Sequence, residues 1–395
     1  MSAGDLPAVL VPDAANRAAL TAVRSLGRHG CRVVTGSEAR RNLASYSRWA
    51  AEVVTHPSAA QEPRAFAEEV GRAAVRTGCT VVLPAADVPA NALIAHRDAL
   101  PAGVRLLVPP AEALALAHDK ARLADLARSL GLAVPDGFVG GPGVADDPRT
   151  AALGYPLVLK PAVSRYLKDG RWTGAAVRIV KDRDELVRTA GAAPFTDVPF
   201  LVQAKVPGEG RGVFVLAKDG RVRCAFAHRR IRERPPWGGV STLCEAAPPE
   251  PALAADAERL MAALRWSGVA MVEYKWDPET RRHWLMEING RFWGSMQLAV
   301  AAGVDFPWLL YEQEVLGRDE AQPVSRLDVR LWWLPGDLDH VLLRVRRGGL
   351  GALGGVVRDL LHTREGRRLD TDTLDWSDPR PFLHECAEWV REVLR

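Results

Sequence analysis

The chain has 395 residues, which is enough for two or three domains with hydrophobic cores of their own. Its charged fraction of 25% and net charge of +4 are ordinary for a globular protein, and arginine is spread along the chain, so we expect no nucleic-acid partner. No secretory leader stands out, nor any apolar run near the ~20 residues of a membrane span, so we expect a cytoplasmic protein without membrane contact.

Strands and helices alternate along the first third of the chain. Short apolar runs that end at turn-forming residues predict strands, and longer runs of helix-forming residues between them predict helices. We expect strands at residues 8–11, 31–35, 80–84 and 104–108, and helices at residues 19–30, 63–77 and 88–100. This alternation predicts a parallel sheet covered by helices. The segment lacks a G-x-G-x-x-G turn, so a nicotinamide or flavin cofactor is not expected here.

Strands dominate the middle of the chain. We expect strands at residues 156–161, 174–180, 200–208, 212–217 and 222–227, and helices at residues 119–127, 251–264, 294–302 and 381–394. The turn Lys218-Asp219-Gly220 predicts a hairpin between the last two of these strands. Beyond about residue 322 the chain is rich in tryptophan and then helical, and packing is its expected role.

Two further strands, at residues 269–275 and 284–291, form the most informative segment. Because side chains alternate between the faces of a strand, Glu287 and Asn289 share one face, and Glu273 lies opposite Glu287 if the turn closes near residue 280. Directly opposed carboxylates destabilise a sheet, whereas a hard divalent cation between them would stabilise it. We therefore predict a metal site here, and Arg291 just beyond it could hold an anion. The alternative is an ordinary solvated strand face, which the flanking apolar residues make less attractive.

Two lysines stand where they could reach a phosphate group. Lys160 ends the strand at residues 156–161, which would fix its stem, and Lys120 opens the helix that follows the first domain. Lysine is a compact point charge suited to phosphates. A single lysine in such a place is more often a solvated surface residue. The phosphate-binding interpretation therefore depends on both lysines together with the two strands at residues 269–275 and 284–291.

Five motifs, taken in their order along the chain, resemble those of the ATP-grasp superfamily. They are Asp119-Lys120, residues 131–135 (GLAVP), 155–161 (YPLVLKP), 201–208 (LVQAKVPG) and 286–295 (MEINGRFWGS). Each motif is weak alone, but their order and spacing are specific, and the resemblance covers about residues 115–310. The last motif is similar to the carboxylate–amine ligase, or predicted carboligase, branch rather than to the biotin carboxylases.

The resemblance implies an α/β fold that becomes α+β in the ATP-grasp part. A Rossmann-like pre-ATP-grasp domain would be followed by a small lobe, a large lobe with the metal site, and a C-terminal helical extension. The expected ranges of these four parts are residues 1–114, 115–195, 196–320 and 321–395.

The resemblance also implies a role for individual residues, with ATP and Mg²⁺ as cofactors and Mn²⁺ as an alternative metal. The implied sets are Lys120 and Lys160 for the ATP phosphates; Gln203, Ala204, Lys205 and Val206 for the adenine hinge, with Glu209 for the ribose; Glu273, Glu287 and Asn289 for the metal; and Arg291, Arg230 and Arg229 for the substrate carboxylate and acyl phosphate. A guanidinium matches such oxyanions with two parallel hydrogen bonds. For Arg229 and Arg230 an ordinary charged strand end is the alternative.

Three positions depart from the family pattern. A glycine-rich loop does not directly follow Lys160, strict register would put Gly210 rather than Glu209 at the ribose, and Gly290 stands where proline is common. These departures bear on the phosphate loop and the ribose contact more than on the metal site.

The implied reaction is ATP-dependent ligation of a carboxylate to an amine, or to a thiol, through an acyl phosphate, with release of ADP and phosphate. The partners would be a small-molecule carboxylate and amine, and a homodimer is one assembly left open. The alternatives are phosphoryl transfer of the carboxylase or kinase type, and a module that binds ATP without catalysis.

Overall fold

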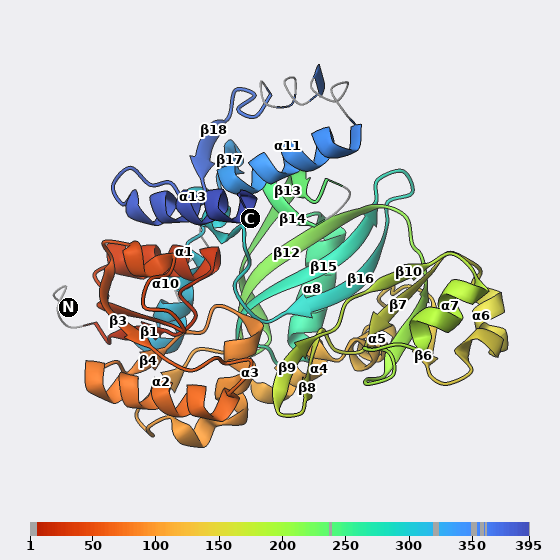
Figure 1. Ribbon diagram of the computed structural model, residues 1–395, viewed down its shortest axis with the longest axis horizontal. Coiled ribbons are helices and arrows are strands. Elements are labelled where there is room, and N and C mark those ends of the chain that lie inside the picture. The colour runs from red at the N-terminus through yellow and green to blue at the C-terminus, as the bar shows by residue number, and fades with distance from the viewer. Residues whose placement is uncertain are drawn as a thin grey trace.

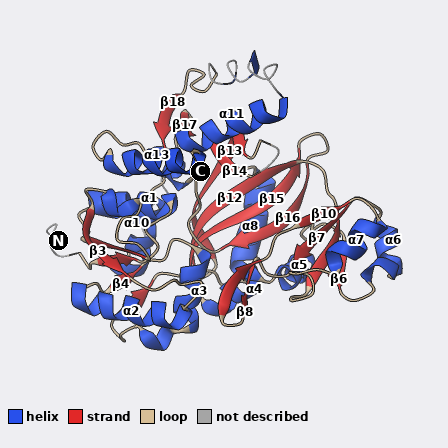
Figure 2. Ribbon diagram, viewed as in Figure 1, coloured by secondary structure: helices blue, strands red, loops and turns tan. Residues whose placement is uncertain are grey.

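The computed structural model describes residues 6–236, 239–318, 324–348, 354–355, 359 and 362–394. Among these residues, the strands form sheets of five, four and seven strands and one two-stranded hairpin. Figure 1 shows the N-terminal domain on one side of the large central sheet and a smaller lobe on the other. The distribution of helices around the three sheets is clear in Figure 2. No helix in the described ranges combines the length and apolarity that crossing a membrane requires.

The N-terminal domain is the predicted parallel sheet with helices packed on it. Its strands lie in the order β3-β2-β1-β4-β5 and all pair in parallel. They are β1 (Val9–Val11), β2 (Val33–Ser37), β3 (Ala50–Thr55), β4 (Val81–Val82) and β5 (Arg105–Leu106), with helices α1 (Arg17–Arg28), α2 (Pro63–Thr77) and α3 (Asp87–Ala95). Only β3 falls outside the predicted elements. The carboxyl ends of such strands are where α/β sheets bind ligands, and α3 begins at the end of β4.

The small lobe is an antiparallel sheet in the order β10-β7-β11-β6. Its strands are β6 (Gly137–Gly140), β7 (Leu157–Pro161), β10 (Arg178–Val180) and β11 (Phe200–Ala204), and helices α4 (Ala111–His118), α5 (Lys120–Ser129), α6 (Pro148–Leu153) and α7 (Arg183–Ala190) accompany them. A separate hairpin of β8 (Arg165–Lys168) and β9 (Arg171–Gly174) follows β7. Asp119 begins α5 by accepting hydrogen bonds from the backbone of Ala121 and Arg122, which fixes Lys120 at the start of the helix.

The large lobe is built on a sheet in the order β16-β15-β12-β13-β14-β17-β18. Its strands are β12 (Glu209–Lys218), β13 (Arg221–Arg234), β14 (Val240–Ala247), β15 (Gly268–Asp277), β16 (Arg282–Asn289), β17 (Val329–Trp332) and β18 (Arg368–Thr371). Helix α8 (Pro251–Ala263) covers one face, with Leu260 and Met261 buried against Val213 and Val215. The other face packs on the N-terminal domain through a core that includes Phe214, Phe226 and Phe292. The sheet therefore has one face towards α8 and one towards the first domain.

The C-terminal extension contains the predicted helices and, in addition, two strands. Helices α9 (Met296–Ala301) and α10 (Phe306–Tyr311) lead into strands β17 and β18, which lengthen the large sheet, and helices α11 (Leu334–Gly348) and α13 (Arg380–Val393) complete the chain. Both strands are short, and β17 pairs with β14 and β18 with β17. The predicted border at residue 321 falls outside the described residues, and the four domain ranges stay predictions.

Candidate ATP and metal site

The hairpin of β15 and β16 brings the two predicted metal-site glutamates face to face. The register pairs Glu273 with Glu287 and Met271 with Asn289, as the alternation of the sequence predicts. A β-bulge then leaves Met286 without a partner on β15, since Tyr274 pairs with Leu285. An unpaired bulge residue turns its backbone groups away from the ladder, and the Met286 carbonyl here accepts a hydrogen bond from Lys160 Nζ at 3.3 Å.

The carboxylates of Glu273 and Glu287 are joined by one amide. Asn289 Nδ2 donates to Glu273 Oε1 at 3.1 Å and to Glu287 Oε1 at 3.3 Å. Burial and the charge of Glu287 raise the pKa of Glu273. Burial acts the same way on Glu287, but the charges of Lys120 and Lys160 outweigh it and lower its pKa. Two carboxylates and an amide within reach of one point are a donor set that suits a hard divalent cation such as Mg²⁺.

Both predicted phosphate lysines are buried beside these carboxylates. Lys120 and Lys160 are each 7% exposed. Lys120 Nζ lies 3.7 Å from Glu287 Oε2 and donates to Ser164 Oγ at 2.6 Å. Burial lowers the pKa of both lysines, and in Lys160 the nearby charge of Lys120 lowers it further. Two ammonium groups held this close have more donors than the surrounding acceptors use, which is the arrangement that a polyanion such as a triphosphate satisfies.

Arg291 lies at the end of the hairpin and reaches into the N-terminal domain. Its Nε donates to Asp87 Oδ2 at 2.6 Å, and one terminal nitrogen donates to Asn289 Oδ1 at 3.4 Å. His118 Nε2 lies 3.8 Å from the other oxygen of Asp87. Asp87 and His118 could not be predicted from the sequence alone, because only the packing of two domains brings them to Arg291.

A cavity of about 370 Å³ opens beside this group of charges. Its walls come from α3, α4, the β8–β9 hairpin and β16, and include Asp87, Lys120, Trp172, Glu287 and Asn289. The β8–β9 hairpin is held against the first domain by a hydrogen bond from Trp172 N to Ala60 O at 2.7 Å. The cavity is therefore enclosed by three parts of the chain, and Glu287 and Lys120 are among its lining residues.

The structure separates Arg229 from Arg230, which the sequence analysis grouped together. Arg230 Nη2 lies 3.7 Å from Glu273 Oε2, on the face of the sheet that carries the two glutamates. Arg229 is the next residue along β13, so it faces the opposite side, where it binds Glu245. Glu245 is buried and also binds Arg330 at 2.9 Å. Of the two arginines, only Arg230 thus lies beside the predicted metal-site glutamates, because strand alternation points Arg229 away from them.

This difference predicts opposite results for two neighbouring substitutions. For the ligase activity that the sequence resemblance implies, Arg230→Ala should lower the rate of ADP release about 10²-fold, because it removes the charge that would face the developing oxyanion. Arg229→Ala should leave that rate unchanged and instead lower the thermal stability, since Glu245 loses a partner. Steady-state ADP release and thermal unfolding of both variants check this prediction. Equal rates for the two variants would contradict the assignment of the two faces.

The predicted adenine hinge is only partly free to bind a ligand. Gln203 is buried and pairs on both sides, with Val158 and Gly137, and Ala204 N donates to Asp136 O at 2.8 Å. Beyond the strand, no backbone hydrogen bond within the described part of the chain involves Lys205 or Val206. The backbone groups that remain for adenine are therefore those of Lys205 and Val206.

Glu209, the predicted ribose-binding residue, begins β12 and binds Arg211. By strand alternation Glu209 shares a face with Arg211 and Val213, whereas Gly210 and Gly212 lie on the face of Glu273. A Cβ atom at position 210 would lie 3.7 Å from the Arg230 guanidinium. Strict register thus places Gly210, not Glu209, on the face that carries the metal-site glutamates.

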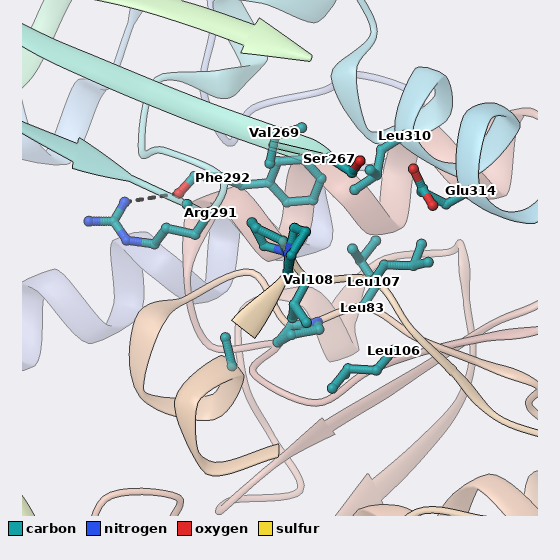
Figure 3. A pocket seen from close by; sticks show the side chains of 16 residues that line it. Leu83, Leu106, Leu107, Val108, Ser267, Val269, Arg291, Phe292, Leu310 and Glu314 are labelled. Carbon is teal, nitrogen blue, oxygen red and sulfur yellow. Dashed lines mark hydrogen bonds between the residues drawn. The ribbon is translucent and has the colours of Figure 1, made fainter. Parts of the chain in front are cut away.

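A second cavity, of about 220 Å³, lies on the other side of Arg291. Figure 3 shows Leu83, Leu107, Val108 and Phe292 around it, while the guanidinium of Arg291 points out of it. This cavity is mostly apolar and lies between β15 and the linker after β5. Arg291 therefore lines the smaller cavity, and its guanidinium is directed away from that cavity towards Asp87.

Close packing at position 290 explains why this chain has glycine where the family pattern commonly has proline. A Cβ atom there would lie 2.4 Å from Leu114 Cδ1 and 2.9 Å from the ring of Trp266. We expect Gly290→Ala to destabilise the fold by about 1–3 kcal/mol, the usual cost of overpacking a buried position. Chemical denaturation checks this result against Gly103→Ala, where a Cβ atom would meet no atom within 4 Å. Equal stabilities of the two variants would show that the pocket around Gly290 can expand.

Solved structures with the same fold include complexes with nucleotides. Biotin carboxylase from Campylobacter jejuni, solved with β,γ-ATP, matches 84% of this chain and 75% of its own, with 16% identity and a TM-score of 0.64. The biotin carboxylase domain dimer of 2-oxoglutarate carboxylase from Hydrogenobacter thermophilus, in complex with MgADP and bicarbonate, matches 80% and 71%, with 18% identity and a TM-score of 0.61. N5-carboxyaminoimidazole synthetase from Staphylococcus aureus matches 81% and 80%, with 13% identity and a TM-score of 0.61. No curated protein sequence gives a significant match.

These matches, together with the two lobes and the lysine–glutamate site, define an ATP-grasp fold, as the sequence motifs predict. More particularly, residues 196–335 match the family model described as "ATP-grasp in the biosynthetic pathway with Ter operon". This match covers β11 to β17 and therefore includes Arg229, Arg230 and the two predicted metal-site glutamates.

Proposed function

We propose that the protein is an ATP-dependent ligase that joins a carboxylate to an amine through an acyl phosphate and releases ADP and phosphate. The observation that carries this proposal is the cluster of two buried lysines, Lys120 and Lys160, with the opposed carboxylates of Glu273 and Glu287. Lys120 and Glu287 of this cluster line the larger cavity. Nucleotide complexes of proteins with the same fold, one with MgADP and bicarbonate, support ATP as the energy source.

Glu273, Glu287 and Asn289 would hold Mg²⁺, with Mn²⁺ as an alternative. Bound there, the metal would neutralise charge on the phosphate oxygens. The opposed carboxylates support this assignment, because their pairing across β15 and β16 is otherwise unfavourable. A variant that lacks one of them should bind the metal less tightly.

The first chemical step transfers the γ-phosphoryl group to the substrate carboxylate. A carboxylate oxygen attacks the γ-phosphorus, the bond to the ADP oxygen breaks, and ADP leaves. Lys120 and Lys160 would stabilise the charge that spreads over the phosphoryl oxygens. Positioning and electrostatics supply most of the catalysis, so the site needs no nucleophilic side chain.

The second step forms the amide. The amine nitrogen attacks the acyl carbon, the carbon–oxygen bond to phosphate breaks, and the amine loses a proton as phosphate leaves. Arg291 and Arg230 would hold the oxygens of the carboxylate and of the acyl phosphate, since guanidinium groups match both. The enclosing β8–β9 hairpin would keep water from the reactive acyl phosphate.

A screen of ADP release tests the proposal. Purified protein with Mg²⁺ and ATP would be offered a panel of carboxylates and amines, singly and in pairs. A ligase releases ADP over many turnovers only when both an acid and an amine are present, because the acid alone supports at most one equivalent per site. A kinase turns over with one acceptor, and a binding module releases no ADP. A thiol in place of the amine tests the related thioester-forming reaction.

A further inference from the structure

Arg291 belongs to the large lobe, yet its strongest contact is with the N-terminal domain. Arg291 Nε lies 2.6 Å from Asp87 Oδ2, a charge-assisted hydrogen bond between residues 204 positions apart. Both side chains are mostly buried, at 28% and 29% exposed. A partly buried pair of this length fixes the guanidinium more firmly than an exposed ion pair would.

The other contacts of Arg291 fix the orientation of its plane. One terminal nitrogen donates to the backbone oxygen of Phe292 at 2.9 Å, and the other donates to Asn289 Oδ1 at 3.4 Å. A guanidinium has five N–H donors. Within the described residues these contacts use three of them, which leaves one N–H on each terminal nitrogen. Two such donors are what a phosphoryl or carboxylate group accepts side by side.

Asp87 is placed to hold Arg291 rather than only to begin a helix. It is the first residue of α3, where an acidic side chain suits the helix dipole. However, its carboxylate also lines the larger cavity with Lys120, Glu287 and Asn289, and its second oxygen faces His118 at 3.8 Å. One oxygen of Asp87 thus accepts the hydrogen bond from Arg291, and the other faces His118 at the wall of the cavity.

We propose that Asp87 is a positioning residue: it fixes the Arg291 guanidinium so that its two remaining N–H groups meet the oxyanion of the reaction. The identity of that oxyanion, a phosphoryl or acyl-phosphate group, rests on the proposed ligase function. The N-terminal domain thereby completes the catalytic arrangement of the large lobe. The contact persists when the nucleotide binds, since Arg291 uses other donors for the ligand.

The first test compares Asp87→Ala with a matched control in the same domain. Asp98→Ala removes an exposed carboxylate that pairs with Arg64 at 3.1 Å. For Asp87→Ala we expect kcat for ADP release to fall about 10- to 100-fold, as loss of an orienting partner does, with KM for ATP almost unchanged. Formate, which fits the space of the lost carboxylate, should restore part of this rate. Asp98→Ala should match the unsubstituted protein throughout.

A purely structural role would give a different result. If Asp87 acted only through the helix dipole, Asp87→Ala would lower the stability slightly and leave kcat unchanged. An unchanged kcat in Asp87→Ala, or a lowered kcat that formate does not raise, would overturn the proposal.

A second measurement needs no turnover and separates this proposal from the proposed function. In ¹⁵N-arginine-labelled protein, the Arg291 Nε–H signal, assigned with Arg291→Lys, should exchange slowly with water. It should stay slow when Mg²⁺ and the non-hydrolysable β,γ-imido ATP bind. Faster exchange on binding would mean that Arg291 leaves Asp87, and the positioning role would be wrong. If no substrate pair ever stimulates ADP release, the ligase function fails, and this signal alone decides the role of Asp87.

Discussion

Glu287→Gln should abolish ATP turnover and leave the fold intact. Glu287 is opposed to Glu273, receives the Asn289 amide and lies 3.7 Å from Lys120, so it connects the predicted metal to the phosphate-binding lysines. Glutamine keeps the size and one oxygen but loses the charge that a divalent cation requires. We expect ADP release to fall at least about 10²–10³-fold, the loss typical of a principal electrostatic group.

The control for this variant is Glu279→Gln, an exposed glutamate in the turn of the same hairpin. It should release ADP at the unsubstituted rate. Circular dichroism and thermal unfolding should be similar for both variants and for the unsubstituted protein. Near-normal ADP release by Glu287→Gln would contradict the assignment of Glu287 as a metal ligand.

Lys160→Met should weaken ATP binding and at the same time stabilise the protein. Lys160 is buried, and burial together with Lys120 lowers its pKa. A lysine whose pKa is lower in the folded than in the unfolded state opposes folding at neutral pH, because its charged form is favoured by unfolding. Methionine keeps the apolar stem and removes this cost. We therefore expect a higher Tm and a loss of affinity for the β,γ-imido ATP complex of about 10- to 100-fold, the equivalent of ~1.5–3 kcal/mol for a hydrogen bond to a charged group.

Titration calorimetry and thermal unfolding measure the two effects separately. Lys181→Met serves as the control, since Lys181 is exposed at the start of α7. Its nucleotide affinity and its Tm should both stay close to those of the unsubstituted protein. If Lys160→Met bound the nucleotide with full affinity, Lys160 would be a structural residue and the phosphate site would lie elsewhere. A lower Tm would mean that the attraction between the Lys160 charge and Glu287 stabilises the fold by more than the burial of that charge destabilises it.

The hairpin was predictable because its evidence is local. Strand alternation and one turn fix the partner of Glu273, and the structure has the predicted pair. The same alternation, applied to β13, would have separated Arg229 from Arg230, but the charge pattern alone does not say which face of that strand meets the site. The bulge at Met286 also escapes a simple alternation rule, since nothing in the strand sequence marks the extra residue.

Features that depend on distant packing could not be predicted. Asp87 begins a helix like many other acidic residues, and only the docking of the first domain on the large lobe makes it the partner of Arg291. Strand β18 carries two charged residues and a single apolar one, so its sequence resembles a loop, whereas β17 is mostly apolar but only four residues long. They become strands because β14 offers an open sheet edge, which tertiary context supplies and local propensity does not.

The attachment of the last segment to the first helix has a consequence for synthesis. Buried Asp378 accepts hydrogen bonds from Arg24 Nε at 2.9 Å, from Ser47 Oγ at 2.6 Å and from the backbone of Arg48 at 2.8 Å. Arg24 is 2% exposed, so without Asp378 it would be a buried charge lacking its counter-ion. Because Asp378 is made more than 300 residues later, the first domain emerges from the ribosome before its own interior is complete. The domain made first therefore reaches its full stability only after residue 378 has been made.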